Sequence, residues 1–281
     1  MTTFVSVTDA HVHLLPERLL RAIRRALTEQ AGWRFPHPTV QDEIEETLET
    51  AGIERYFALP YAHKPGMADD LNEWVLDRST NSEMAVPFAT VHADDSVASV
   101  VERAFEAGAR GLKFQCPVQK CGPTDPRLDP AFELAAEYDR PIVFHAGTAP
   151  IYEGNPHVGV DQFAQFLASY PEIRASCAHM GTFEHEAYID LVREHDNAFL
   201  DTSFVMSSAI GEYIDFDPAT ISNAVFEDLS GSIMYGSDYP NIPHSYRAER
   251  ELLLERDLPN EVYEDLFWRS ATRFLGQSEG E

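Results

Sequence analysis

Histidines and one aspartate occur in this sequence at spacings that suit metal chemistry. His11 and His13 stand two residues apart. In an extended strand such residues project to the same face, so both imidazoles can reach one ion. Two later apolar runs end in His145 and His179, and Asp238 follows a further run. Imidazole and carboxylate suit Zn2+, and a water of lowered pKa on such an ion supplies hydroxide at neutral pH.

Eight short apolar or aromatic runs indicate the strands that would position these residues. They are Phe4–Thr8, Arg55–Leu59, Val86–Val91, Gly111–Phe114, Pro141–Phe144, Arg174–Ala178, Ala198–Asp201 and Ser232–Tyr235. Helical apolar spacing separates them, as in Pro16–Gln30, Ser96–Ala107 and Pro130–Tyr138, the last with Asp129 as its cap. Tyr246–Arg256 and Asn260–Leu275 are expected to be two further helices.

This alternation predicts an α/β fold with a parallel sheet. A count of eight strands favours closure into a (β/α)8 TIM barrel, with an open doubly wound sheet as the alternative. We expect one domain over residues 1–281 with a C-terminal helical extension, because no stretch rich in Pro, Gly or Ser marks a linker. The carboxyl ends of barrel strands meet at one rim, so the four histidines and Asp238 would converge there.

Composition narrows the classes of partner. The chain has 47 acidic and 21 basic residues, a formal net charge of −26, which argues against nucleic acid as a partner. The acidic residues are spread along the chain, as in a halophile, where molar salt shortens the Debye length to about 3 Å and screens the repulsion between them. An acidic protein from an ordinary cytosol is the alternative. Three cysteines without a CxxC pair make a disulfide framework improbable. With no apolar run long enough for a membrane span and no secretory signal, a cytoplasmic protein is expected.

The ordered set of residues resembles the amidohydrolase superfamily, most closely its amidohydrolase-2 branch, which includes aminocarboxymuconate semialdehyde decarboxylase and related metal-dependent hydrolases. The likeness spans nearly the whole chain, from the HxH pair to the GSDYP segment that holds Asp238. It implies that His11, His13, His145 and Asp238 bind one divalent ion, with Zn2+ expected and Mn2+ or another ion as alternatives. It also implies that His179 stands beside the metal-bound water and transfers a proton, a role that Asp238 shares.

Lys113 is open to several interpretations. An ammonium group that contacts substrate is the simplest of them, and a lysine that only reaches the rim is another. In some branches of the superfamily a lysine at this strand end is carbamylated and bridges two metals. Here His145 and His179 would then bind the second ion.

Loop and strand-end residues complete the expected site. His63 and His157 lie in loops that could present them to substrate, as does Tyr61. Asp201, at the end of the seventh run, is expected to accept a hydrogen bond from a ligand histidine. His37, His185, His195 and His244 are expected at the surface.

The leading hypothesis is a metal-dependent hydrolase acting on an amide, lactone or related bond of a small molecule. Nonoxidative decarboxylation of a small carboxylic acid is the alternative on the same site, and Arg110 and Lys113 are the nearest cations in sequence that could hold a carboxylate. A noncatalytic metal-binding barrel subunit is the alternative of another class. The partner expected is a small-molecule substrate, and assembly into a homo-oligomer stays open.

Overall fold

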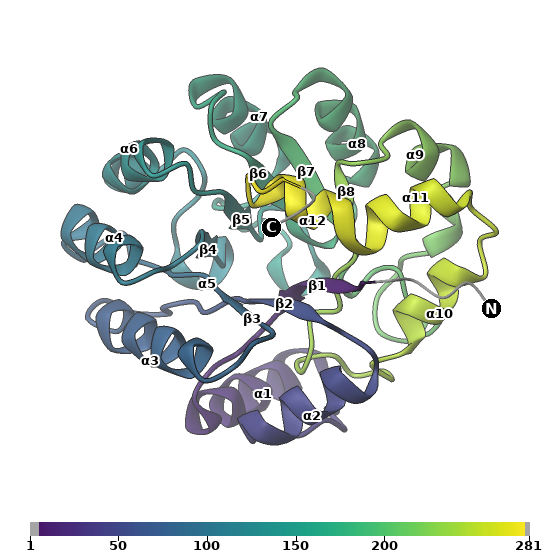
Figure 1. The fold of residues 1–281 in the computed structure, drawn as a ribbon, viewed down its shortest axis with the longest axis horizontal. Coiled ribbons are helices and arrows are strands. Elements are labelled where there is room, and N and C mark those ends of the chain that lie inside the picture. Colours follow the sequence, from purple (N-terminus) through teal and green to yellow (C-terminus); the bar gives the residue numbers. More distant parts are fainter. Residues whose placement is uncertain (1–5, 279–281) are drawn as a thin grey trace.

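A ring of parallel strands enclosed by helices makes up residues 6–278, the part of the chain that the computed structural model describes (Figure 1). The strands follow one another around the ring in chain order: β1 (Thr8–Val12), β2 (Arg55–Ala58), β3 (Ala85–Pro87), β4 (Leu112–Phe114), β5 (Ile142–Phe144), β6 (Ala175–Cys177), β7 (Ala198–Asp201) and β8 (Ile233–Met234). The helices are α1 (Glu17–Ala31), α2 (Gln41–Thr50), α3 (Ala68–Thr80), α4 (Val97–Glu106), α5 (Cys116–Gln119), α6 (Asp129–Glu137), α7 (Val160–Ser169), α8 (His185–Glu194), α9 (Asn223–Asp228), α10 (Ala248–Leu254), α11 (Asn260–Glu264) and α12 (Ser270–Phe274).

Backbone pairing closes the ring at two seams. Strands β1 to β3 form one parallel sheet and β4 to β8 another. Ala89, just beyond β3, bridges Leu112 of β4, and Val12 of β1 bridges Tyr239, just beyond β8. The amide of Ala10 also donates to the carbonyl of Tyr235 at 2.8 Å. The chain therefore forms the expected (β/α)8 TIM barrel rather than an open sheet.

Apolar side chains, most of them large, fill much of the interior of the barrel. They alternate with outward-facing residues along the strands, as the period of two requires. The interior cluster includes Ala10, Phe57, Leu59, Phe88, Val143, Phe199 and Met234. Gly111 leaves room for this packing, because a Cβ there would lie 2.3 Å from the Phe88 ring.

The last helices cover one end of the barrel. Figure 1 shows the chain turning inward after α11, so that α12, in yellow, lies over the ring of strands. Phe274 of α12 stacks on Phe57, with ring centroids 6.1 Å apart, and meets Phe199 edge-on at 5.2 Å. The C-terminal extension thus plugs the end where the strands begin.

The first strand differs from the sequence prediction. That prediction covers Phe4–Thr8, of which residues 4 and 5 lie outside the described part, whereas β1 runs over Thr8–Val12. Asp9 fits inside the strand because its carboxylate is fully partnered. One oxygen accepts from the Ser237 hydroxyl at 2.6 Å and from the Tyr246 hydroxyl at 3.1 Å. Bonds from across the barrel thus keep a polar residue within an interior strand.

Some helix boundaries also differ. Asp129 is the first residue of α6 and not its cap, which is Leu128. The predicted helix Asn260–Leu275 is α11 and α12 joined by a π-helical turn at Asp265–Arg269. Within residues 6–278, no helix combines the length and apolar character that crossing a bilayer requires.

Candidate active site

The seam between β1 and β8 brings three of the expected ligands together. Oδ1 of Asp238 lies 3.0 Å from Nε2 of His13 and 3.5 Å from Nε2 of His11. Gly236 makes this approach feasible, since a Cβ at that position would lie 2.9 Å from the His11 Cβ. The Asp238 amide also donates to the His11 carbonyl at 2.8 Å. Residues more than two hundred positions apart thus share one small volume at the rim.

Hydrogen bonds fix the tautomers of the first two histidines. Nδ1 of His13 donates to the carbonyl of Leu59 at 2.9 Å, because a carbonyl can only accept. Nδ1 of His11 faces a carboxylate oxygen of Asp201 at 3.0 Å, the contact that the sequence analysis expects of Asp201. Both rings therefore point Nε2 toward the carboxylate of Asp238. Such bonds to the far ring nitrogen are typical of metal-binding histidines.

His145 and His179 form a pair on the other side of the site. Nδ1 of His179 donates to the carbonyl of Ser203 at 3.1 Å, which leaves its Nε2 unprotonated. That Nε2 lies 3.0 Å from Nδ1 of His145, which must then be the donor. In its neutral form each of the four rings would carry the proton on Nδ1, and Nε2 of His179 accepts the hydrogen bond from His145.

Burial sets the charge state of the cluster. It lowers the pKa of His11 to about 3, with a further contribution from the Lys113 charge. Burial likewise holds the pKa values of His145 and His179 below the ordinary histidine value. Burial alone would raise the pKa of Asp238, but its contacts with His13 and the other histidines hold it below the ordinary range. Neutral imidazoles beside an ionised carboxylate are the protonation states that a metal ion requires.

Lys113 lies inside the barrel and not at its rim. Its side chain is fully buried, and Nζ lies 3.3 Å from Nε2 of His11. Burial lowers the pKa of Lys113 to about 8, against the raising effect of Asp201 and Asp238. The ammonium group therefore adjoins the ligand cluster, but Lys113 is absent from the residues that line the pocket.

The cluster fits a divalent cation. Ligand atoms of His11, His179 and Asp238 all lie within 4.8 Å of one another. Oδ1 of Asp238 is buried and accepts no hydrogen bond from the described residues, although the His13 ring is close. A divalent cation at this position would bind the Asp238 oxygen and a neutral His13 ring together.

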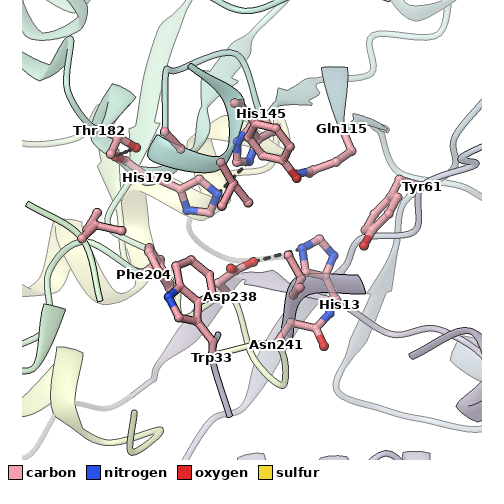
Figure 2. A pocket seen from close by; sticks show the side chains of 15 residues that line it. His13, Trp33, Tyr61, Gln115, His145, His179, Thr182, Phe204, Asp238 and Asn241 are labelled. Atoms are coloured by element: carbon pink, nitrogen blue, oxygen red, sulfur yellow. Dashed lines mark hydrogen bonds and ion pairs between the residues drawn. The ribbon is translucent and has the colours of Figure 1, made fainter. Parts of the chain in front are cut away.

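A pocket opens above this cluster (Figure 2). Its empty volume is about 640 Å3, open mouth included. In Figure 2, His145 and His179 face His13 and Asp238 across the cavity. The walls are mainly aromatic and aliphatic, with a few uncharged polar groups: Leu27, Trp33, Tyr61, Gln115, Ala149, Ile151, Tyr152, Thr182, Phe204, Ile214 and Asn241. A small molecule of largely apolar surface would fit such a space.

The structure does not bring every predicted residue to the pocket. His63 is exposed and His157 half-buried, and neither lines the cavity. Arg110 precedes β4 and so lies at the opposite end of the barrel, beside Arg55 and Arg140. His244, expected at the surface, is buried with 4% of its area exposed. The loop after β8 folds inward there, which local sequence does not reveal.

Sequence reasoning missed most of the pocket walls. Asn241 follows Asp238 by three residues, and Gln115 follows Lys113 by two, so nearness to recognised residues could have found both. Trp33 and Phe204 carry no such signal, because long-range packing alone places them together, with ring centroids 5.2 Å apart.

Backbone strain concentrates at this rim. His179, Phe204 and Asp238 adopt positive φ values of 58°, 66° and 62°, although none is glycine. Such conformations are held by surrounding contacts and cluster at functional sites. The three residues lie shortly after the ends of β6, β7 and β8, and all three line the cavity.

Solved structures share this fold. An uncharacterised TIM-barrel protein from Bordetella bronchiseptica is 18% identical, with a TM-score of 0.75 over 97% of this chain and 99% of that one. A probable 2-pyrone-4,6-dicarboxylic acid hydrolase from Acinetobacter baumannii is 11% identical, with a TM-score of 0.67 over 97% and 100% of the two chains. A 2,6-dihydroxybenzoate decarboxylase from Rhizobium is 13% identical, with a TM-score of 0.63 over 97% and 99%.

Two further comparisons, one with curated proteins and one with a family model, concern the family of this chain. No curated protein matches the chain. The model described as amidohydrolase, however, matches residues 8–277, which include every residue of the cluster. The chain therefore belongs to the amidohydrolase family, in its amidohydrolase-2 branch, and is an enzyme of that family.

Proposed function

We propose that this enzyme is a metal-dependent hydrolase of an amide, lactone or related bond in a small molecule. The observation that carries the proposal is the gathering of ligand atoms of His11, His179 and Asp238 within 4.8 Å, with a buried Asp238 oxygen that accepts no hydrogen bond from the described residues, beneath a largely apolar pocket. A divalent ion bound there, for which we propose zinc, would supply a water of pKa about 7 and polarise a carbonyl group.

Four residues would hold that ion: His11, His13, His145 and Asp238. The bonds from His11 to Asp201 and from His13 to Leu59 keep both rings oriented and unable to rotate away. The strand pairing of β1 with the segment after β8 fixes the spacing between the two histidines and Asp238. This part of the site is therefore rigid before any ligand binds.

His179 would hold and return the proton. Its Nδ1 is fixed on the carbonyl of Ser203, so Nε2 is the atom that accepts. Burial lowers the pKa of this ring, which keeps it an acceptor at neutral pH. One observation favours another division of roles, since Nε2 of His179 lies within the 4.8 Å cluster and can itself be a ligand. Metal analysis of single variants separates the two arrangements, as described in the Discussion.

Decarboxylation is the second candidate. A solved structure with the same fold is a decarboxylase, and Lys113 places one ammonium group beside His11. Hydrolysis is supported better, because Arg110 lies at the far end of the barrel and no lysine or arginine is among the described residues that line the pocket. A noncatalytic barrel subunit is disfavoured by membership of a family of enzymes.

The test combines metal analysis with a substrate panel. We expect about one ion per purified chain, and hydrolysis of at least one aryl ester, lactone or anilide that a chelator abolishes and Zn2+ restores. Two ions per chain would indicate carbamylation of Lys113. Release of CO2 from an aromatic acid without hydrolysis of any panel member would establish the decarboxylase instead. A loaded protein inactive in both assays would contradict both functions.

A further inference from the structure

Asn241 has an unused hydrogen-bond donor at the pocket. The residue lies in the loop after β8, is 5% exposed, and lines the cavity beside His13 and Asp238 (Figure 2). Its Nδ2 atom is buried and donates to no acceptor among residues 6–278. A buried amide group that lacks a partner is uncommon and costly, and at a pocket wall it marks a place for a ligand atom.

Arg24 fixes the direction of this donor. Nε of Arg24 donates to Oδ1 of Asn241 at 3.3 Å, and since a guanidinium has no acceptor, the amide cannot be turned around. The other guanidinium nitrogens donate to the carbonyls of His37 at 2.6 Å and of Pro38 and Pro240 at 2.8 Å. Arg24 is thus fully engaged behind the wall, and its charge does not line the cavity.

Gln115 offers the complementary group on another side of the cavity. Its Oε1 is buried and accepts no hydrogen bond from the described residues, while its side chain hydrogen-bonds the Tyr152 hydroxyl. Figure 2 shows Gln115 and Asn241 on different sides of the space. The pocket therefore presents one free donor and one free acceptor, both uncharged.

The remaining walls make a charged substituent unfavourable. The rings of Tyr61, Tyr152, Trp33 and Phe204 also line the cavity and suit a planar ring. Asp238 is the carboxylate that lines the cavity, and the described lining residues include no lysine or arginine. A carboxylate on the substrate ring would be buried there without a counter-ion, which is strongly disfavoured.

We propose that the substrate is an uncharged planar molecule with a neutral oxygen acceptor bound by Nδ2 of Asn241 and an N–H or O–H donor bound by Oε1 of Gln115. This proposal rests on the hydrolase function above for the bond that is cleaved. It concerns the non-reacting part of the substrate, and Asn241 and Gln115 determine specificity for that part. The unpartnered amide atoms call for hydrogen-bonding groups on the substrate, and the lack of lysine and arginine among the described lining residues disfavours an anionic group.

The first arm of the test uses two esters that differ in one substituent. 4-Carbamoylphenyl acetate carries a neutral donor and acceptor, and 4-carboxyphenyl acetate carries an anion of the same shape. For the metal-loaded wild type we expect kcat/KM to favour the carbamoyl ester by about tenfold or more. Asn241→Asp keeps the acceptor for Arg24 but loses the donor, so kcat/KM for the carbamoyl ester should fall about tenfold. Asn223→Asp, the same change at an exposed site on α9, should leave kcat/KM for this ester unchanged.

The second arm measures binding and does not depend on turnover. Benzamide is titrated into the metal-loaded wild type and into Asn241→Asp, with tryptophan fluorescence as the signal because Trp33 lines the cavity. We expect binding to be about tenfold weaker in the variant. If no ester is hydrolysed while benzamide binds in this way, the proposed function fails and the substrate class stands. Equal or better hydrolysis of the carboxy ester, no benzamide binding to the wild type, or equal binding to both proteins would overturn the inference.

Discussion

The two ends of this barrel carry opposite kinds of charge. At the end where the strands begin, four arginines open β2 or precede β4, β5 and β6: Arg55, Arg110, Arg140 and Arg174. At the end where the strands finish, histidines and carboxylates gather at the pocket. A single layer of apolar side chains separates the two sets within the barrel.

Two of these arginines, Arg55 and Arg174, bind the C-terminal segment of the chain. Nε of Arg174 donates to the carbonyl of Phe274 at 2.8 Å, at the end of α12, and Arg55 donates to Gln277 at 2.7 Å. Cations at the carboxyl end of a helix satisfy its last carbonyls and its dipole. This end therefore holds the closing helix in place. The pocket end instead leaves an Asp238 oxygen and two amide atoms, Nδ2 of Asn241 and Oε1 of Gln115, without hydrogen-bond partners among the described residues. One end of the barrel stabilises the fold, and the other is left incomplete for ligands.

The largest effect should come from the histidine pair. His179→Ala is expected to lower kcat by about 10²- to 10⁴-fold while the ion stays bound, because the ring handles a proton. His145→Ala is expected to lose the ion after dialysis. Metal content and kcat on the best panel substrate are the measurements, with His195→Ala at the end of α8 as control. Loss of the ion from His179→Ala and its retention in His145→Ala would exchange the two roles.

A change at the opposite end should affect stability alone. Phe274→Ala removes the ring that packs on Phe57 and Phe199. We expect the free energy of unfolding to fall by about 3–5 kcal/mol. Metal content of the folded variant at 25 °C should not change. Denaturant titration gives the first quantity, and Leu254→Ala, at a position 39% exposed, is the control. Equal losses of metal affinity and stability in Phe274→Ala would show that the two ends are coupled.

A smaller effect is expected at Asp201, a residue of the pocket end whose carboxylate is hydrogen-bonded within the protein. Asp201→Asn weakens the bond that orients His11, so metal affinity should fall by about 10- to 100-fold. Competition with a chromogenic chelator measures this affinity. Asp190→Asn, an exposed change on α8, should leave it unaltered. An unchanged affinity in Asp201→Asn would mean that the strand alone orients His11.

The smallest effect concerns a buried acid beside the pocket. Glu249 is fully buried on α10, and its nearest ionisable partner is Nε2 of His244 at 3.7 Å. Burial, and then the nearby carboxylates of Asp9 and Asp238, raise its pKa well above the ordinary value. Above about pH 4.5 the unfolded chain releases a proton that the native state retains, so this residue costs stability as the pH rises.

Glu249→Gln removes that dependence. Between pH 4 and pH 7 the variant should gain stability over the wild type by about 1.4 kcal/mol for each pH unit above the unfolded-state pKa over which native Glu249 stays protonated, measured by chemical denaturation at both values. Glu251→Gln, an exposed change on the same helix, should give no such trend. A constant difference between the Glu249→Gln variant and the wild type at the two pH values would show that Glu249 is ionised in the native state.

The alternation of apolar runs and helical spacing predicted the barrel because both periods are local properties. Ala198–Asp201 was placed correctly, since β7 is apolar and ends in its one acid. The start of β1 was misplaced because Asp9 looks like a residue that ends a strand, and its partners Ser237 and Tyr246 lie far along the chain. Local sequence patterns therefore predict helices and strands well. They do not show which polar side chains will be hydrogen-bonded by residues distant in the sequence.

The site shows the same division. His11, His13, His145, His179 and Asp238 could be found because each follows a predicted strand. Arg110 was misleading, because nearness to Lys113 in sequence hides the fact that the two residues occupy opposite ends of one strand. The aromatic walls could not be predicted, since Trp33 and Phe204 meet only after the ring has closed.

The position of the seam between β1 and the segment after β8 links assembly of the site to completion of the fold. The strand nearest the amino terminus meets the last one through Val12 and Tyr239, and His11, His13 and Asp238 flank that junction. These three residues therefore come together only when the ring of strands has closed. An ion bound by His11, His13 and Asp238 would link the first strand of the barrel to the segment after the last one. It would therefore favour the closed ring of strands by mass action.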